Sequence, residues 1–506
     1  MSSQRKVRVR FAPSPTGGLH LGGVRTALFN YLYARHHGGQ FVLRIEDTDQ
    51  TRFVPGAEEY INECLEWCGL TPDEAPNKPG EYGPYRQSER KASYRQYAEQ
   101  LVNDGFAYYA FDTAEELDAR RKEESNFRYS HENRLHLRNS LSLPKEETTK
   151  LLADGHPHTI RIKMPVEETV SFEDMIRGRV AFETGLVDDK VLLKADGMPT
   201  YHLAVVVDDK AMEISHVFRG EEWLPSAPVH ILLWEYLGWK DKMPHWAHLP
   251  LILKPDGNGK LSKRDGDRLG FPVYAMNWTE PKSGDVTKGF REMGFLPEAF
   301  INMLAVLGWN DGTEQEIFSI EDLVSKFSVD RIGKAGAKFD FEKAKWFNHE
   351  WIKKIDDAQI LPQLEELLKQ HGVKYYAMDY VADVLTLVKE RLIFIQDFWD
   401  QAFFFFTRPE TYSVDAIKPK WDENKTAFFQ DIAQEFMTIP TWTADSLEPF
   451  FKGKIADSGM KIGELMMPFR IMLVGGKFGP DVFQIAEILG KDEVVKRIEM
   501  ALPHFA

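Results

Sequence analysis

The sequence predicts an α/β fold with a parallel sheet, followed by a region that is entirely helical. Residues 7–11 alternate apolar side chains with arginines, which is typical of a strand. Residues 24–32 carry apolar side chains at the spacing of one helix face. A second alternating segment, 41–46, follows, and a strand–helix–strand crossover makes its two strands parallel. Helical spacing then dominates after about residue 330.

The turn between the first strand and its helix has the composition of a phosphate cradle. Its sequence, APSPTGGLHLGG, ends the strand with prolines and opens the helix near Gly22 and Gly23. The first turn of a helix offers free N–H groups and partial positive charge, and glycines let a phosphate approach. We therefore expect a nucleotide site with His20 beside it. Because ligands bind beyond the carboxyl ends of parallel strands, the residues expected at that edge are Arg10, Ser14, His20, Glu46 and Asp47.

Composition is typical of a globular protein without a membrane span. The chain has 506 residues, 43% of them hydrophobic and 28% charged, and no long apolar run. This length corresponds to about three domains. The N-terminal MSSQRKVRVR lacks the apolar core of a signal peptide, so we expect a cytoplasmic protein.

The acidic net charge of −15 argues, taken alone, against a protein that binds nucleic acid. A total charge does not exclude a basic face, however. One group of cations lies near the start of the helical half and comprises Arg331, Lys334, Lys338, Lys343 and Lys345.

Cys64 and Cys68 are spaced four residues apart on a predicted helix. Such a pair could supply two ligands to zinc, but a structural site normally needs four and the chain has no other cysteine. We therefore interpret both as buried thiols of the core. A reducing compartment also makes a disulfide unexpected.

The middle of the chain interrupts the α/β pattern and then returns to it. Residues from about 106 to 199 mix charged helical segments with short alternating strands. The apolar run in HLAVVVDD then predicts a buried parallel strand. ISHVFRGEEW and HLPLILK predict two more strands, with a helix over 226–236 between them. We expect these strands to complete the sheet that begins at residue 7.

A basic, glycine-flanked segment, LKPDGNGKLSKRDGD, follows the last of these strands. Its Asp-Gly and Asn-Gly pairs are turn signals, and Lys260, Lys263 and Arg264 come directly after them. Considered alone, the segment is typical of a solvated hairpin tip. Together with the turn around His20, it is interpreted as a loop that closes over polyphosphate.

Five segments, in order, resemble the signatures of one family. RFAPSPTGGLHLGG and FVLRIEDTDQTR are similar to the first two signatures of class I aminoacyl-tRNA synthetases, and specifically of bacterial-type glutamyl-tRNA synthetases. PTYHLAVVVDD, FRGEEW and KLSKR complete the set. The helical segments after residue 330 resemble the anticodon-binding part of that family. The resemblance covers nearly the whole chain, which makes it far more specific than any single motif.

The resemblance implies a domain order. Residues 1–105 and 200–255 would form the two halves of a Rossmann-type catalytic domain. Residues 106–199 would be an inserted α+β domain that binds the acceptor stem of tRNA. Residues 256–330 would be a stem-contact region with the KLSKR loop, and 331–506 an all-α anticodon-binding domain.

The resemblance also implies site residues. For L-glutamate they are Arg10, Ser14, Glu46, Tyr201 and Arg219, with Arg219 on the side-chain carboxylate. For ATP they are His20, Gly22, Gly23, Glu222, Leu251, Lys260, Ser262 and Lys263. Of these, His20, Lys260 and Lys263 would be catalytic, because they stabilise charge on the phosphates.

The implied reaction is attack of the glutamate carboxylate on the α-phosphorus of ATP, followed by transfer of the acyl group to the 3′-terminal adenosine of tRNA-Glu. Mg²⁺ would enter with ATP, and no residues of the chain are predicted as metal ligands. We expect a monomer with no membrane partner. Two departures from the family pattern are Gly23, where the class has a second histidine, and Val205, where relatives often have asparagine. No zinc is predicted, since Ala110 and Asp112 stand near the place of a knuckle found in some relatives.

Several alternatives share part of this pattern. A non-discriminating enzyme would also charge tRNA-Gln. A glutaminyl enzyme would have a β-barrel anticodon part, and a truncated relative would lack the helical half. A non-catalytic tRNA-binding paralogue is expected to lose His20 or the loop lysines, which are all present. An adenylyltransferase for a small cofactor would leave the residues after 330 without a role.

Overall fold

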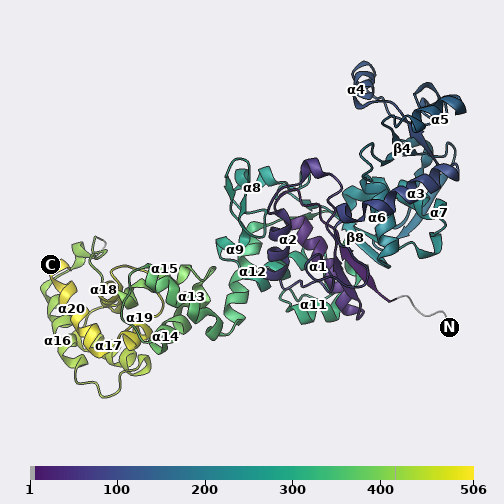
Figure 1. Cartoon of the computed structure of the whole chain (residues 1–506). Coiled ribbons are helices and arrows are strands. Elements are labelled where there is room, and N and C mark those ends of the chain that lie inside the picture. Colours follow the sequence, from purple (N-terminus) through teal and green to yellow (C-terminus); the bar gives the residue numbers. More distant parts are fainter. Residues whose placement is uncertain (1–5, 416, 506) are drawn as a thin grey trace. The chain divides into compact units, whose positions relative to one another are not determined.

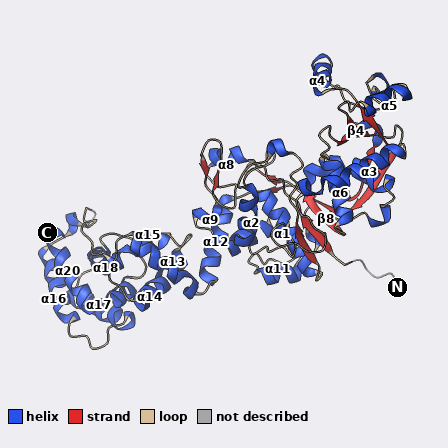
Figure 2. Ribbon diagram, viewed as in Figure 1, coloured by secondary structure: helices blue, strands red, loops and turns tan. Residues whose placement is uncertain are grey.

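The computed structural model describes residues 6–415 and 417–505, apart from the side chains of residues 263, 264 and 267. The chain divides into two compact units, Met1–Ala344 and Lys345–Ala506. The first is an α/β unit, and the described residues of the second form helices and loops (Figures 1 and 2). The α/β fold followed by a helical region is therefore confirmed.

The main sheet of the first unit contains the predicted crossover. Strands β1 (Arg8–Phe11) and β2 (Gln40–Leu43) are joined through helix α1 (Leu21–His36) and pair in parallel. The full strand order is β2-β1-β8-β9-β5-β6. Strands β8 (His216–Gly220) and β9 (His245–Leu249) are also parallel to their neighbours, and β8 lies in the segment ISHVFRGEEW as expected. The single strand expected over HLPLILK is wrong, because only the first two residues of this segment belong to β9. Two later residues form β10 (Ile252–Leu253), which belongs to a separate two-stranded sheet.

The interrupting segment contributes strands to two sheets. The hairpin of β5 (Thr169–Asp174) and β6 (Gly178–Glu183) extends the main sheet, with β5 parallel to β9. Strands β3 (Ala107–Ala110), β4 (Thr159–Ile162) and β7 (Val191–Leu193) form a separate antiparallel sheet. The hairpin therefore brings residues of the interruption beside β9.

The strand predicted over HLAVVVDD is wrong, because this segment forms helix α6 (Tyr201–Ala211). Every side chain from residue 203 to 209 is buried. A helix covered on all sides gives the same unbroken apolar run as a buried strand, and periodicity cannot distinguish the two. Helix α6 packs against α3 (Lys91–Asn103) and α7 (Ala227–Tyr236).

The helix expected around Cys64 and Cys68 and the helix expected over 226–236 are both present. The first of them is α2 (Ala57–Trp67). The other helices of the first unit are α4 (Ala114–Glu123), α5 (Lys145–Ala153), α8 (Lys263–Leu269), α9 (Phe290–Met293), α10 (Pro297–Val306) and α11 (Ile320–Lys326). Its short strands are β10 (Ile252–Leu253), β11 (Trp278–Thr279), β12 (Val286–Thr287) and β13 (Ala337–Lys338), and β10 pairs with β13.

The second unit is a helical bundle with an aromatic core. Phe404, Phe429, Phe451 and Phe469 are completely buried in it, and aromatic side chains supply much of the apolar area that stabilises a core. Its helices are α12 (Phe341–Lys354, shared with the end of the first unit), α13 (Asp357–Gln370), α14 (Met378–Val388), α15 (Asp397–Phe406), α16 (Glu423–Phe436), α17 (Ala444–Ser458), α18 (Ile462–Val474), α19 (Val482–Leu489) and α20 (Lys491–Phe505).

The two cysteines are buried free thiols, which confirms their interpretation as core residues. Burial raises the pKa of Cys68 above its usual value. Within the described parts of the chain, no helix combines the length and apolar character needed to cross a membrane.

Candidate active site

A cavity of about 790 Å³ lies at the edge of the main sheet where β1 and β8 end. Its walls come from the turn after β1, the first turn of α1, the segment after β2 and the residues that follow β8. This is the carboxyl edge at which parallel sheets bind ligands. The volume is in the range of small-molecule sites.

Most of the predicted site residues lie in the wall of this cavity. They are Arg10, Ser14, Gly22, Gly23, Glu46, Tyr201, Arg219 and Glu222. Residues His20, Leu251, Lys260 and Ser262 do not line it. The side chain of Lys263 lies outside the described residues.

His20 is the N-cap residue of α1, and its Nδ1 accepts a hydrogen bond from the Gly22 N–H at 3.2 Å. The Gly23 N–H donates to the His20 carbonyl at 2.8 Å. These first-turn N–H groups therefore already have protein partners, unlike the free groups that the sequence suggested. The helix end still carries its partial positive charge toward the cavity.

The two glycines at the start of α1 differ in their surroundings. A Cβ at Gly22 would meet only the His20 imidazole, at 3.8 Å, so this position faces open space. A Cβ at Gly23 would lie 2.6 Å from Leu19 Cδ1. A side chain at position 23 would therefore require Leu19 to shift.

The basic segment after β9 lies on the same side of the molecule as the α1 turn. Lys260 Nζ forms an ion pair of 2.7 Å with Glu222 Oε1 in the cavity wall. Beyond α8, the Val273 carbonyl accepts from the Leu21 N–H at 3.0 Å. Lys260 therefore reaches the wall of the cavity through Glu222, and the residue after α8 that bonds to Leu21 lies beside the α1 turn.

Leu251 and Ser262 hold this segment in place. The Leu251 N–H donates to Glu221 Oε1 at 3.0 Å. The Ser262 N–H donates to Asp265 Oδ2 at 3.0 Å and caps α8. The second half of KLSKR is therefore the first turn of a helix, and the loop is shorter than expected.

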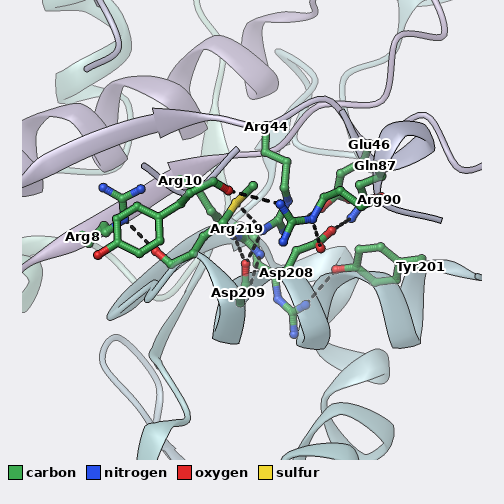
Figure 3. Close-up of polar contacts among 12 residues, drawn as sticks. Arg8, Arg10, Arg44, Glu46, Gln87, Arg90, Tyr201, Asp208, Asp209 and Arg219 are labelled. Atoms are coloured by element: carbon green, nitrogen blue, oxygen red, sulfur yellow. Dashed lines mark hydrogen bonds and ion pairs between the residues drawn. The ribbon is translucent and has the colours of Figure 1, made fainter. Parts of the chain in front are cut away.

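A buried network of charges lies behind one wall of the cavity (Figure 3). Arg44 Nη1 lies 2.7 Å from Asp209 Oδ1, and Arg44 Nη2 lies 2.9 Å from Glu46 Oε1. Arg10 Nε reaches the same Asp209 oxygen at 3.2 Å. Burial alone would raise the pKa of Asp209, but Arg10 and Arg44 together lower it. Burial raises the pKa of Glu46, against the attraction of both arginines.

The neighbouring carboxylate, Asp208, anchors the start of α3 and the turn before it to α6. Its oxygens accept from Gln87 Nε2 at 2.8 Å, from Arg90 Nε at 2.6 Å and from the Tyr94 hydroxyl at 2.8 Å. Sequence reasoning missed this role because it placed Asp208 at the end of a strand. Sequence reasoning also missed the role of Arg44 in this network. Arg44 and Glu46 are two residues apart, so their side chains are expected on the same face of the strand.

Arg219 has a different environment from Arg10 and Arg44. It donates from Nη1 to the Tyr201 hydroxyl at 2.8 Å and from Nε to His248 Nε2 at 3.0 Å. Its buried Nη2 has no hydrogen-bond partner, and no carboxylate among the described residues forms an ion pair with it. A buried donor without a partner is costly unless a ligand supplies an acceptor.

Four carboxylates line the cavity, those of Glu46, Asp47, Asp49 and Glu222, but they do not form a metal cluster. Among residues 6–415 and 417–505, no group of three or more His, Cys, Asp or Glu side chains is arranged to hold a metal ion. Val205 is buried within α6 and offers no polar group to the cavity.

Comparison with known proteins gives a consistent set of relatives. Residues 6–346 match the family described as tRNA synthetases class I (E and Q), catalytic domain, and residues 345–502 match an anticodon binding domain. The chain is 53% identical over 501 residues to a glutamate–tRNA ligase of Phocaeicola vulgatus, covering 99% of each chain. It is 53% identical over 502 residues to a glutamate–tRNA ligase of Flavobacterium johnsoniae, covering 98% of this chain and 99% of the relative.

Among solved structures, the chain resembles a glutamate tRNA ligase from Elizabethkingia meningosepticum in complex with its amino acid. The TM-score is 0.95 at 47% sequence identity, over 99% of this chain and 100% of the other.

Proposed function

Because the chain belongs to the family of class I tRNA synthetases for glutamate and glutamine, we propose that its cavity binds L-glutamate and ATP together. The protein acts as a glutamate–tRNA ligase, with a Rossmann-like catalytic domain followed by a helical anticodon-binding domain. The assignment of residues to the two substrates is our proposal, and it is argued below from the contacts in the cavity.

The observation that carries the glutamate site is the buried, unpartnered Nη2 of Arg219. A guanidinium without a protein carboxylate is suited to a carboxylate ligand, because its planar fork matches the two oxygens. The Tyr201 hydroxyl, bonded to Nη1, fixes the orientation of that fork. We assign the side-chain carboxylate of glutamate to Arg219.

The other end of glutamate is assigned to residues on β1 and after β2. Arg10 would hold the α-carboxylate, and Glu46 would accept from the α-ammonium group. Ser14, in the turn after β1, offers a hydroxyl beside them. Arg10 and Glu46 are linked through Arg44 and Asp209, so the network fixes the spacing of these opposite charges.

The nucleotide end of the cavity is assigned to the start of α1 and the loop after β10. Gly22 and Gly23 would face the phosphates, with His20 and Glu222 beside them and Leu251 and Ser262 supporting the loop. Lys260 must exchange Glu222 for a phosphate oxygen. This exchange is inexpensive, because an exposed ion pair contributes at most about 1 kcal/mol. Lys263 would join Lys260 on the leaving pyrophosphate.

The reaction needs alignment and charge stabilisation more than covalent help. A glutamate α-carboxylate oxygen bonds to the α-phosphorus as the bond to pyrophosphate breaks, which leaves glutamyl-adenylate. The acyl group then passes to the 3′-terminal adenosine of tRNA, and AMP leaves. Mg²⁺ would be held mainly by the phosphates of ATP.

The remaining parts of the chain are assigned to tRNA. We propose that residues 106–199 contact the acceptor stem, that 256–330 contact the stem next to it, and that 331–506 read the anticodon. The chain is proposed to work as a monomer in the cytoplasm, where tRNA is available and its free thiols stay reduced.

Aminoacylation assays test the proposed substrates. Purified protein should attach glutamate to tRNA-Glu in an ATP- and Mg²⁺-dependent manner, and glutamine should not replace glutamate. The same assay with tRNA-Gln decides whether the enzyme is discriminating. If the protein with His20 intact acylates neither tRNA, the proposed function is wrong.

Affinity for tRNA should fall steeply with salt. Arg331, Lys334 and Lys338 are exposed, and each phosphate contact contributes a slope of about −0.7 to −0.9 to log K against log [salt]. The variant K334A/K338A should therefore flatten the slope by roughly 1 to 2 units. Filter-binding titrations from dilute to physiological salt measure it.

The matched control for this titration is K240A/K242A, which removes two exposed lysines elsewhere on the same unit. Its slope should equal that of the wild type. A wild-type affinity that is independent of salt would show that phosphate contacts do not dominate binding.

A further inference from the structure

The hydrogen bond between Arg219 and His248 fixes the protonation pattern of the imidazole. The two residues lie directly opposite each other on β8 and β9, and Arg219 Nε lies 3.0 Å from His248 Nε2. A guanidinium nitrogen always donates, so His248 Nε2 must be the acceptor. The proton of a neutral His248 must then be on Nδ1.

Asp174 receives that proton. His248 Nδ1 lies 2.6 Å from Asp174 Oδ2, and both side chains are completely buried. The Asp174 carboxylate also accepts from the backbone N–H groups of Ile176 and Arg177 at 3.0 Å each. Burial alone would raise the pKa of Asp174, but these hydrogen bonds lower it, so the carboxylate stays ionised and fixes the tautomer of His248.

A second imidazole lies on the other side of the guanidinium. Arg219 Nη1 lies 3.4 Å from His230 Nδ1, and His230 Nε2 lies 3.2 Å from His202 Nδ1. Burial lowers the pKa of His230 well below its usual value and that of His202 to about 4. Both rings are therefore neutral near pH 7, and His230 can accept from Arg219 while it donates to His202.

The acceptors around Arg219 are thus neutral, in contrast to those around Arg10 and Arg44. Arg10 and Arg44 are paired with Asp209, and Arg44 also with Glu46. Arg219 is held instead by the Tyr201 hydroxyl and two imidazoles. Its position is fixed without a protein carboxylate to neutralise its charge.

We propose that His248 and Asp174 are positioning residues that determine specificity for the side-chain carboxylate of glutamate. Asp174 fixes His248 as an acceptor, and His248 aims Arg219 while it leaves the charge and the Nη2 donor for the substrate. A glutamine amide cannot use that charge, so the same arrangement favours glutamate. This inference rests on the proposed assignment of Arg219 to glutamate.

The substitution D174N is expected to change which nitrogen of His248 accepts a hydrogen bond. An amide –NH₂ facing Nδ1 makes that nitrogen the acceptor, so the proton moves to Nε2 and two donors then face each other at Arg219. We expect the KM for glutamate to rise roughly 10- to 100-fold, the KM for ATP to stay within about twofold and kcat to change little. The preference for glutamate over glutamine should fall by a similar factor.

The conservative variant H248Q tests the direction of the hydrogen bond. A glutamine oxygen can accept from Arg219 and its –NH₂ can donate toward Asp174, so KM for glutamate should rise only about threefold. H248L removes the acceptor and should resemble D174N. The double variant D174N/H248Q has no imidazole at position 248, so D174N can no longer act by changing a tautomer. Its KM for glutamate should therefore be no higher than that of D174N.

The control is H245Q, the same exchange at the first residue of β9, where an exposed histidine stacks on His216. It should leave both KM values unchanged. Thermal unfolding of each variant separates loss of fold from loss of alignment.

The outcomes separate the two proposals. A wild-type protein that does not use glutamate removes the proposed function itself. A wild type that uses glutamate, with a D174N variant whose KM for glutamate stays within twofold, overturns the positioning role alone. An equal increase in the KM for glutamate and in the KM for ATP would also overturn the positioning role, because it would indicate a structural role for Asp174. If D174N does not fold, H248Q and H248L decide, and equal KM values for these two reject the inference.

Discussion

Replacement of Arg219 by alanine is expected to raise the KM for glutamate by roughly 10²- to 10⁴-fold, while the affinity for ATP stays within about twofold. The variant leaves the substrate carboxylate buried beside Tyr201 and two neutral imidazoles, with no cation to pair with it. An unpaired buried charge costs about 3–5 kcal/mol, which sets this range. Steady-state aminoacylation kinetics with each substrate varied in turn measure both effects.

Two companion variants sharpen the test. R219K keeps the charge but loses the planar fork, so its defect should be intermediate. R179A removes an exposed arginine of β6 and should behave as wild type. If R219A leaves the KM for glutamate unchanged, the assignment of Arg219 to the glutamate site is wrong. An equal loss of ATP affinity would show that the residue acts on the whole cavity.

The parallel crossover and the carboxyl-edge site could be predicted from the sequence because their signals are local. Alternation in β1, apolar spacing in α1 and the glycine-containing turn between them each lie within a few residues. The rule that ligands gather at the carboxyl edge then brings Arg10, Ser14 and Glu46 together without further information.

Helix α6 shows where local pattern fails. Burial on every side removes the polar face that would reveal helical periodicity. The error had a consequence for the site, because a strand would not place Tyr201 at one end of the element and Asp209 two turns away. In the helix, Tyr201 contacts Arg219 while Asp209 contacts Arg10 and Arg44.

The histidine and aspartate behind Arg219 could not have been found from spacing. Asp174 and His248 are 74 residues apart and belong to strands that pair only because the β5–β6 hairpin joins the main sheet. Neither residue lies in a segment that resembles a family signature. Their role depends on which nitrogen carries a proton, and that follows only from the partners on both sides of the ring.

The substitution D209N is expected to destabilise the catalytic unit by about 3–5 kcal/mol. Arg10, Arg44, Asp209 and Glu46 form a buried set of two positive and two negative charges. Loss of one carboxylate leaves a buried guanidinium charge uncompensated. Because the chain has two compact units, scanning calorimetry should show the shift in one transition and not in the other.

The control for D209N is E99Q, which removes one partner of an exposed ion pair on α3, where Arg95 is 60% and Glu99 46% exposed. An exposed pair contributes at most about 1 kcal/mol, so its transition should scarcely move. Equal shifts in D209N and E99Q would contradict a special role for the buried network.

Thermal unfolding of the wild type and D209N at acidic pH values tests whether the ionised Asp209 carboxylate stabilises the fold. Because Arg10 and Arg44 lower the pKa of Asp209 in the folded protein, the unfolded chain binds its proton more readily. The stabilisation from Asp209 is therefore complete above the ordinary aspartate pKa of about 3.9 and is lost as the pH falls through the lower folded value. D209N has no such proton to gain, so the melting temperature of its affected transition should depend less on pH in this acidic range. Parallel pH profiles for the two proteins would show that this carboxylate is not held ionised by the arginines.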